Sequence, residues 1–320
     1  MQTPVNSKFD RDTPASEVVQ EVDLTGKLAV ITGGSTGLGK ETARALGNAG
    51  ADVFIGARNE EKLENARLEL LGAGTKAVYS VPLDLMEPDS VEQFANAVLD
   101  LDRPVDILIN NAGIMACPLS RNSLGFEAQL ATNFIGHALL TSLLAPALVR
   151  AKTARLVSLS STGHHNSPIV FEDINYESRE YEPFVAYGQS KTANVLLAVQ
   201  AARHLADKGV TVTAVHPGMI ETELGRHFSE EEWAGLMQQT KDLDMPDFKT
   251  VESGAATSVW AATAPELEGL GPIYLEDCQV APIVEEPNAA FGVLQYALDP
   301  DLADQLWVKA EEMLGRKLPL

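Results

Sequence analysis

The chain has 320 residues and carries 24 lysine and arginine residues against 45 aspartate and glutamate residues, a formal net charge of −21. Apolar residues make up 45% and charged residues 22%, a globular balance that excludes wholesale disorder. The negative charge argues against binding to nucleic acid or to an anionic membrane, because both are polyanions. A ligand that carries phosphate must therefore be held by local features that work against the overall field.

The cysteines and the apolar runs predict a soluble, cytoplasmic protein. Cys117 and Cys278 are too few for a disulfide framework and are interpreted as reduced thiols. Residues 1–23 contain no apolar stretch typical of a signal peptide. The longest apolar run, around 138–149, is far shorter than the roughly 20 residues that span a bilayer.

Short apolar runs alternate with helical patterns from residue 28 onward. The runs that predict strands lie at 28–32, 52–56, 76–81, 105–110, 154–160, 210–215 and 272–276. The patterns that predict helices lie at 37–49, 59–71, 88–100, 122–149, 186–208 and 301–314. Continuous apolar strands are expected where both faces of a sheet are covered. The alternation predicts one α/β domain, a doubly wound Rossmann domain with a mostly parallel, seven-stranded sheet.

Two segments fall outside this alternation. Residues 1–24 are predicted to form an N-terminal extension that lies over the main domain, residues 25–320. Residues 219–250 are rich in acidic residues and methionine, and they follow the C-terminal end of a predicted strand. Ligands bind at that edge of open α/β sheets, so this segment is predicted to be a substrate lid. The alternative is a surface insertion without a role in binding.

A glycine-rich loop connects the first predicted strand to the first helix. Residues 32–39 read T-G-G-S-T-G-L-G. Glycine permits a tight turn and close approach of a pyrophosphate, and the helix N-terminus offers unpaired N–H groups to it. We therefore expect this loop to bind a dinucleotide, although a glycine-rich turn without a ligand is the alternative. The loop residues expected to contact the cofactor are Gly33, Ser35, Thr36, Gly37 and Leu38.

This loop resembles the T-G-x-x-x-G-x-G motif of the short-chain dehydrogenase/reductase family. Three further family motifs follow in order: N-N-A-G at 110–113, Y-x-x-x-K at 187–191, and P-G-x-x-x-T at 217–222. The resemblance covers about residues 24–314, and the closer likeness is to the retinol-dehydrogenase-like and WW-domain-oxidoreductase-like branch. That likeness rests on the long stretch 161–187 and on 271–278. The resemblance implies further cofactor contacts at Asp84, Leu85, Asn111, Ala112, Gly113, Tyr187, Lys191, Pro217, Gly218 and Thr222.

The end of the second predicted strand indicates which dinucleotide binds. Folds that prefer NAD place an acidic residue here to bind the ribose 2′-hydroxyl, whereas NADP requires arginine near the 2′-phosphate. Ala57 stands where the acid would be, and Arg58 follows. A guanidinium can donate two parallel hydrogen bonds to a phosphate, so NADP is predicted and NAD is less favoured. The alternative is that Arg58 pairs with Glu60 or Glu61 on the surface.

Tyr187 and Lys191 are four residues apart in a predicted helix, so their side chains share one face. The pKa of free tyrosine, about 10, is too high for a base near neutrality. A nearby lysine and an oxidised nicotinamide would both favour the phenolate, so Tyr187 is predicted to be the general acid or base. Taken alone, the same spacing also fits an ordinary aromatic–cation pair on a helix surface.

Two more residues complete the predicted catalytic set. By resemblance, Ser161 at the end of the fifth strand polarises the substrate oxygen, whereas strand alternation turns Ser160 the other way. Asn133 fits the asparagine of the family that holds a relay water beside Lys191; the alternative is a satisfied buried amide. His164 and His165 are weaker candidates for substrate contact, and His216 is interpreted as structural. The histidines and cysteines lack zinc-ligand spacing, so no metal is predicted.

These features favour an NADP-dependent oxidoreductase that interconverts an alcohol and an aldehyde or ketone. A non-catalytic nucleotide sensor or scaffold on the same fold, or a sugar-nucleotide epimerase or dehydratase, are the alternatives. A hydrophobic pocket for a small substrate is predicted around Ile114, Met115, Phe184 and Met219; the alternative is that they are ordinary core residues. The resemblance also implies a homodimer or homotetramer formed through the long helices.

Overall fold

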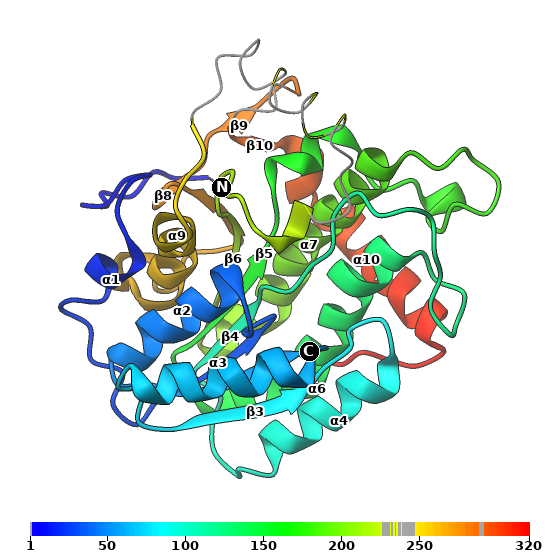
Figure 1. The fold of residues 1–320 in the computed structure, drawn as a ribbon. Helices are drawn as coiled ribbons and strands as arrows, with labels where there is room; N and C mark the ends of the chain where they lie inside the picture. Colours follow the sequence, from blue (N-terminus) through cyan, green and yellow to red (C-terminus); the bar gives the residue numbers. More distant parts are fainter. Residues whose placement is uncertain are drawn as a thin grey trace.

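A parallel sheet forms the centre of the molecule (Figure 1). The computed structural model describes residues 2–225, 231, 233, 235, 238, 247–287 and 291–320. The main sheet has eight strands in the order β3-β2-β1-β4-β5-β6-β7-β8. Their bounds are β1 Leu28–Thr32, β2 Asp52–Ala57, β3 Val78–Pro82, β4 Ile107–Asn110, β5 Ala154–Leu159, β6 Val210–His216, β7 Ile273–Glu276 and β8 Gln279–Val280. A separate pair of strands comprises β9 Ile283–Val284 and β10 Val293–Leu294.

The predicted doubly wound, mostly parallel sheet is confirmed, but the predicted count of seven strands is wrong. The eighth strand, β8, has only two residues and runs antiparallel to β7. Asp277 and Cys278 form the turn between them with φ of 49° and 53°. A two-residue strand after such a turn is too short to produce a periodic pattern in the sequence.

Helices cover both faces of the sheet (Figure 1). Their bounds are α1 Ala15–Val18, α2 Gly37–Asn48, α3 Glu60–Gly72, α4 Pro88–Leu99, α5 Ala128–Leu130, α6 Gly136–Arg150, α7 Pro183–Leu205, α9 Val251–Thr263 and α10 Pro300–Leu314. Local capping sets several of these starts. The side chain of Asn59 accepts from the backbone of Lys62 at the start of α3, and Asp299 accepts from Asp301 at the start of α10.

Side-chain alternation along each strand separates two hydrophobic cores. On β1, Leu28 and Val30 join the core under α4, α6, α7 and α10, whereas Ala29 and Ile31 join the core under α1, α2, α3 and α9. All five residues of β1 are buried, which explains its unbroken apolar run. The strand order reverses beside β1, which lies between β2 and β4, so a crevice opens there at the C-terminal edge.

The predicted helix at 122–149 is wrong at its beginning. Asn122 forms a turn, since its side-chain oxygen accepts from the backbone N–H groups of Leu124 and Phe126. The carboxylate of Glu127 then caps α5 by accepting from Gln129 and Leu130. A π-helix at Ala131–Ile135 connects α5 to α6. Helix α9 was not predicted, because it is rich in small residues and buried on almost every side, so no polar face marks it.

The longest helices lie inside the chain. The stretch Ala128–Arg150 is the one helical stretch among the described residues that is long and apolar enough to cross a membrane, yet 83% of its apolar window is buried within the molecule. Helix α7 has 18 of its 23 residues buried and packs against α10. Helix α10, the chain's own C-terminal helix, therefore covers part of one of the long helices through which we expect oligomers to form.

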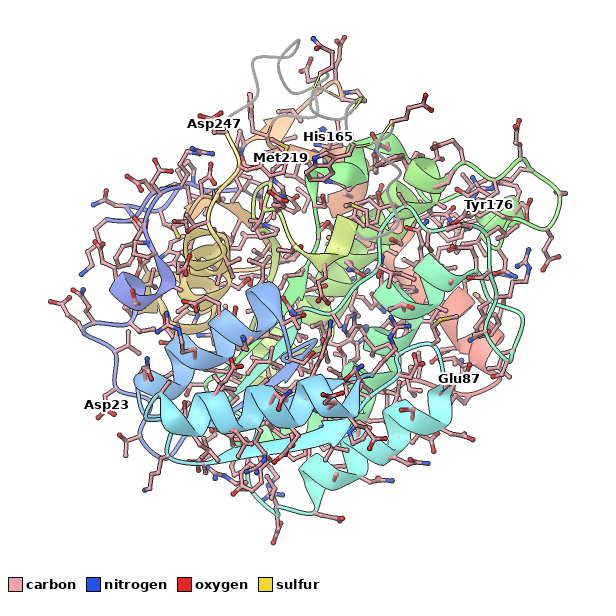
Figure 2. The ribbon with its side chains drawn as sticks, viewed as in Figure 1. Asp23, Glu87, His165, Tyr176, Met219 and Asp247 are labelled. Carbon is pink, nitrogen blue, oxygen red and sulfur yellow. The ribbon has the colours of Figure 1, made fainter. Side chains whose placement is uncertain are left out.

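The N-terminal segment packs on the domain rather than extending from it. Phe9, Ala15, Val18 and Val19 are buried in the core that contains α9. The side-chain amide of Gln2 donates to the backbone carbonyls of Tyr274 and Ala281. Most of the predicted lid at 219–250 lies outside the described residues. Within it, Met219 and Asp247 lie at the same end of the molecule as His165 (Figure 2).

The packing of α1 predicts that Val18→Ala destabilises the fold. Val18 is 5% exposed, so removing two methyl groups should lower the free energy of unfolding by about 2 kcal/mol. Val308 on α10 is 50% exposed, and Val308→Ala is the matched control, expected within about 0.5 kcal/mol of the parent. Urea unfolding of both variants measures the difference. Equal stabilities would show that the N-terminal segment does not contribute to the folded core.

Candidate active site

A cavity of about 1200 Å³ opens where β1, β4, β5 and β6 end. Most of the residues predicted to bind the cofactor or act in catalysis line it. Those lining residues are Gly33, Ser35, Thr36, Gly37, Leu38, Arg58, Leu85, Asn111, Ala112, Gly113, Ser161, Tyr187, Lys191, Pro217, Gly218 and Thr222. Two predicted residues, Asp84 and Asn133, do not line it. The Asp84 carboxylate instead accepts from the backbone of Met86 in its own turn.

The glycine loop has glycine at positions where a larger residue would be strained or would clash with neighbouring atoms. Gly33 and Gly37 have φ of +69° and +51°, in the left-handed region. A Cβ added at Gly39 would lie 2.3 Å from the backbone oxygen of Gly33 and 2.5 Å from the amide nitrogen of Asn111. Helix α2 therefore begins close against the loop, and its first residues, Gly37, Leu38 and Gly39, line the cavity. Such an arrangement suits an anionic pyrophosphate.

The hydroxyl of Thr32 joins the glycine loop to the loop after β4. It accepts hydrogen bonds from the backbone nitrogens of Asn111 and Ala112 at 2.9 and 3.0 Å. In return, the side chain of Asn111 donates to the carbonyl of Thr32 at 2.8 Å. The loops after β1 and β4, which form the cavity wall where the strand order reverses, are therefore linked by hydrogen bonds.

Tyr187 and Ser161 meet inside the cavity. Burial raises the pKa of Tyr187 to about 12, and a hydrogen bond with the Ser161 side chain opposes that rise. The hydroxyl oxygen of Ser161 also accepts from the backbone of Gly163 at 3.0 Å. The hydroxyl of Ser160 donates instead to the backbone oxygen of Lys191 at 2.8 Å. Of the two adjacent serines, Ser161 is thus the one beside the phenol.

Lys191 lies on the same face of α7 as Tyr187, with its ammonium 5.6 Å from the centre of the Tyr187 ring. Among the described residues, the carbonyl of Leu159, at 3.1 Å, is the acceptor that the ammonium reaches. Burial lowers the pKa of Lys191 to about 8. Burial is the largest influence on the pKa of Tyr187, and Ser161 supplies the opposing effect, so the expectation that Lys191 and an oxidised nicotinamide together favour the phenolate stays a prediction.

Asn133 is fully buried in the π-helix, and its amide group is committed to protein partners. Its side-chain oxygen accepts from the backbone of Ile114 at 2.9 Å. Its amide nitrogen donates to the carbonyl of Ile114 at 3.0 Å and to the hydroxyl of Ser190 at 2.8 Å. A Cβ added at Gly113 would lie 3.2 Å from this oxygen and 3.5 Å from the Lys191 ammonium, so both groups approach the same glycine.

The rim of the cavity beyond β2 carries two cations. Arg58 is exposed and has no ion pair within the described part of the chain, so it does not pair with Glu60 or Glu61. Lys62, one helical turn further on, pairs with Glu223 at 2.6 Å. Sequence reasoning missed Lys62. Its signal was the i+4 spacing from Arg58 across the start of α3.

The buried histidines near the cavity hold backbone groups. His164 contacts the carbonyl of Ser161 at 2.7 Å through Nδ1, and its Nε2 accepts from the backbone of Leu294. His216, interpreted as structural, lines the cavity, and its Nδ1 accepts from the backbone of Thr162. Burial lowers the pKa of both rings to about 3. Neither His164 nor His165 lines the cavity.

The residues present fit a bound dinucleotide. The glycine cradle excludes side chains that would block it, and Thr132, at the cavity wall, has a buried hydroxyl with no hydrogen-bond partner among the described residues. The family model of short chain dehydrogenases matches residues 27–233. The chain belongs to the short-chain dehydrogenase/reductase family. It is therefore an oxidoreductase whose fold binds a nicotinamide dinucleotide.

Relatives agree with this membership. A Streptomyces lividans protein named "Probable oxidoreductase" is 45% identical over 299 residues, which cover 92% of this chain and 99% of that protein. Human retinol dehydrogenase 12 is 40% identical over 295 residues, which cover 92% of this chain and 88% of that protein. The crystal structure of an uncharacterised protein from Mycobacterium paratuberculosis is similar with a TM-score of 0.74 at 31% identity, covering 97% and 100%. The predicted likeness to the retinol-dehydrogenase branch is confirmed.

The glycine cradle predicts that Gly39→Ala weakens dinucleotide binding. The added methyl group would meet backbone atoms at 2.3 Å, which cannot move without displacing the loop. Fluorescence titration with NADPH and NADH should show at least about tenfold weaker binding of each. The matched control is Gly72→Ala, at the end of α3, where a Cβ meets nothing within 4 Å. Binding unchanged in Gly39→Ala would contradict the assignment of this loop.

Proposed function

We propose that this enzyme interconverts an alcohol and an aldehyde or ketone with NADP as its cofactor. The observation that carries the proposal is the proximity of Ser161 to the buried phenol of Tyr187, whose pKa it lowers against the effect of burial, with Lys191 one turn away and all three on the cavity wall. The dinucleotide, when bound, supplies or takes up the hydride. The protein then has to orient the carbonyl oxygen and move one proton.

In this proposal, Ser161 and Tyr187 share the substrate oxygen. Both hydroxyls are donors, so together they polarise a carbonyl, and Tyr187 gives the proton as the oxygen gains negative charge. Because the pKa of Tyr187 is raised above its usual value of 10.0, the phenol stays protonated at neutral pH. Carbonyl reduction should therefore be favoured at neutral pH, and alcohol oxidation should accelerate as the pH rises.

Lys191 and Asn133 complete the proposed proton path. The ammonium has N–H groups left for the cofactor ribose and for a water, since Leu159 uses only one of them. The Asn133 oxygen and the ammonium lie against the same face of Gly113. A water held there would connect the phenol to solvent after each turnover.

The preference for NADP rests on the rim of the cavity. Arg58 has no acidic partner among the described residues, and Ala57 leaves no carboxylate to bind the ribose 2′-hydroxyl or repel a phosphate. Lys62 adds a second cation within the same lining. Its exposed ion pair with Glu223 is of a kind that contributes little to stability, so a phosphate can compete for it.

The inner part of the cavity favours a hydrophobic substrate. Ile114, Met115, Phe184 and Met219 line it, as predicted from the sequence, and Trp233 stands 5.9 Å from Phe248 between ring centres at the same wall. We further propose a cytoplasmic location, since the two cysteines form no disulfide and the membrane-length helix belongs to the core. The expected homodimer or homotetramer remains part of the proposal.

A non-catalytic sensor on the same fold is the competing proposal. A sensor needs the glycine loop and the rim cations, but it does not need a serine hydroxyl aimed at a buried phenol. The arrangement of Ser161 and Tyr187 therefore favours the enzyme.

Tyr187→Phe should lower turnover by about 10²- to 10⁴-fold, because the proton donor is lost while the ring is kept. Consumption of NADPH with a panel of aliphatic and aromatic aldehydes and ketones measures this, alongside NADPH binding by fluorescence. Ser161→Ala should lose activity as well, whereas the matched Ser160→Ala should retain more. Near-full turnover in Tyr187→Phe would reject the catalytic assignment.

Arg58→Ala should weaken NADPH binding by about 10- to 100-fold and leave NADH binding within about twofold, because only NADPH carries the 2′-phosphate that the guanidinium would hold. Arg67→Ala is the control, since Arg67 lies on α3, pairs with Glu64 and does not line the cavity. Parallel losses for both dinucleotides, or tighter binding of NADH by the parent, would contradict the NADP proposal.

A further inference from the structure

His137 is buried at the start of α6, beneath the cavity, and it bridges two parts of the site. Its Nε2 lies 2.8 Å from the hydroxyl oxygen of Thr32. Its Nδ1 lies 2.8 Å from the backbone carbonyl oxygen of Asn133. The ring is fully buried, does not line the cavity and belongs to none of the sequence motifs.

The partners of His137 determine its tautomer. The carbonyl of Asn133 can only accept, so Nδ1 must carry a proton and donate it. The hydroxyl oxygen of Thr32 already accepts from Asn111 and Ala112, so its own proton points to Nε2. A protonated Nε2 would leave that hydroxyl proton without an acceptor in a buried place. The imidazole is therefore neutral, with its proton on Nδ1.

Burial also opposes a charge on this ring. The pKa of His137 falls to about 4 because of burial, and the nearby ammonium of Lys191 lowers it further. The hydrogen bond to the carbonyl of Asn133 raises the pKa but does not outweigh burial, so the net shift favours the neutral ring that the hydroxyl of Thr32 requires. The histidine is consequently unsuited to give or take protons during turnover, and its contribution must be geometric.

The bridge continues from Asn133 to the phenol. The amide of Asn133 donates to the hydroxyl of Ser190, and Ser190 donates to the backbone carbonyl of Tyr187 at 2.7 Å. An unbroken chain of hydrogen bonds thus runs from the end of β1, through His137 and the π-helix, to the peptide of Tyr187. The π-helix leaves the backbone of Asn133 in an irregular turn, where a side-chain donor can fix its carbonyl.

We propose that His137 is a positioning residue that fixes the carbonyl of Asn133 to the hydroxyl of Thr32, and thereby holds the proton-transfer residues in register with the dinucleotide loops. This proposal rests on the proposed function, because register matters only if a proton moves at Tyr187. Its chemistry is the reverse of that of a catalytic histidine: the ring must keep the same proton throughout the cycle.

The test compares His137→Phe, which keeps the ring volume and loses both hydrogen bonds, with His137→Asn, whose amide can still donate to the carbonyl of Asn133. His137→Phe should lower kcat by at least about tenfold while NADPH binding changes by less than about threefold. The solvent isotope effect on kcat should increase, because proton transfer becomes slower. His137→Asn should recover most of kcat. If His137 had a purely structural role, the substitutions would change thermal stability. They would not lower kcat selectively over NADPH binding, and His137→Asn would not recover kcat.

A kcat for His137→Phe within about twofold of the parent, or no recovery in His137→Asn, would overturn the proposal. Near-full activity in Tyr187→Phe would instead reject the proposed function, so the two failures are distinguishable. If His137→Phe does not fold, nitrogen NMR of the parent protein tests the proposal by reporting which ring nitrogen of His137 carries the proton. The His137 signal is identified as the one that is lost in His137→Asn. A neutral ring protonated at Nδ1 supports the proposal, and protonation at Nε2 overturns it.

Discussion

Removal of the site from water is the constraint on which the chemistry of this enzyme depends. Burial raises the pKa of Tyr187 and lowers the pKa values of Lys191, His137 and His216. Each shift favours the uncharged form of its group. These buried side chains therefore contribute little charge to the site. A bound dinucleotide would bring the dominant charges, through its phosphates and its oxidised nicotinamide ring. This also explains how a chain with a net charge of −21 can hold an anionic ligand: the glycine loop and the α2 N-terminus act locally.

Neutral histidines then become useful as fixed hydrogen-bonding groups. His164 binds the backbone of Ser161, His216 binds that of Thr162, and His137 binds that of Asn133. In each case a ring with one donor and one acceptor fixes the peptide of a residue in the active site. Position, rather than proton transfer, is what these rings supply, and under the proposed function the phenol of Tyr187 is the group that exchanges protons with substrate.

Much of the fold could be predicted from the sequence because the central strands are buried on both faces and appear as unbroken apolar runs. The chain-order motifs likewise located Ser161, Tyr187 and Lys191 on one cavity. Elements with little periodicity were missed: β8 is two residues long, and α9 is small and buried nearly all round. The start of the helix at 122–149 was wrong because Asn122 and Glu127 compete for the backbone through their side chains.

Tertiary contacts explain the remaining differences. Lys62 joins Arg58 only because α3 begins at the rim of the cavity, and Asp84 turns its carboxylate into its own loop. The role of His137 depends on Thr32, which is 105 residues away in the chain, so no local pattern could indicate it. Lys191 lies close to Tyr187, as expected, and desolvation is the largest influence on the pKa of the phenol in this structure.

In the proposed mechanism, burial keeps the phenol of Tyr187 neutral until a positively charged nicotinamide lies beside it. The most direct measurement is a pH titration of tyrosinate absorbance in the near ultraviolet, taken as the difference between the parent and Tyr187→Phe, with and without oxidised NADP. We predict no tyrosinate signal from Tyr187 near its ordinary pKa of 10.0 in the free enzyme, and a signal at lower pH once the dinucleotide is bound. Identical titrations in both states would contradict the claim.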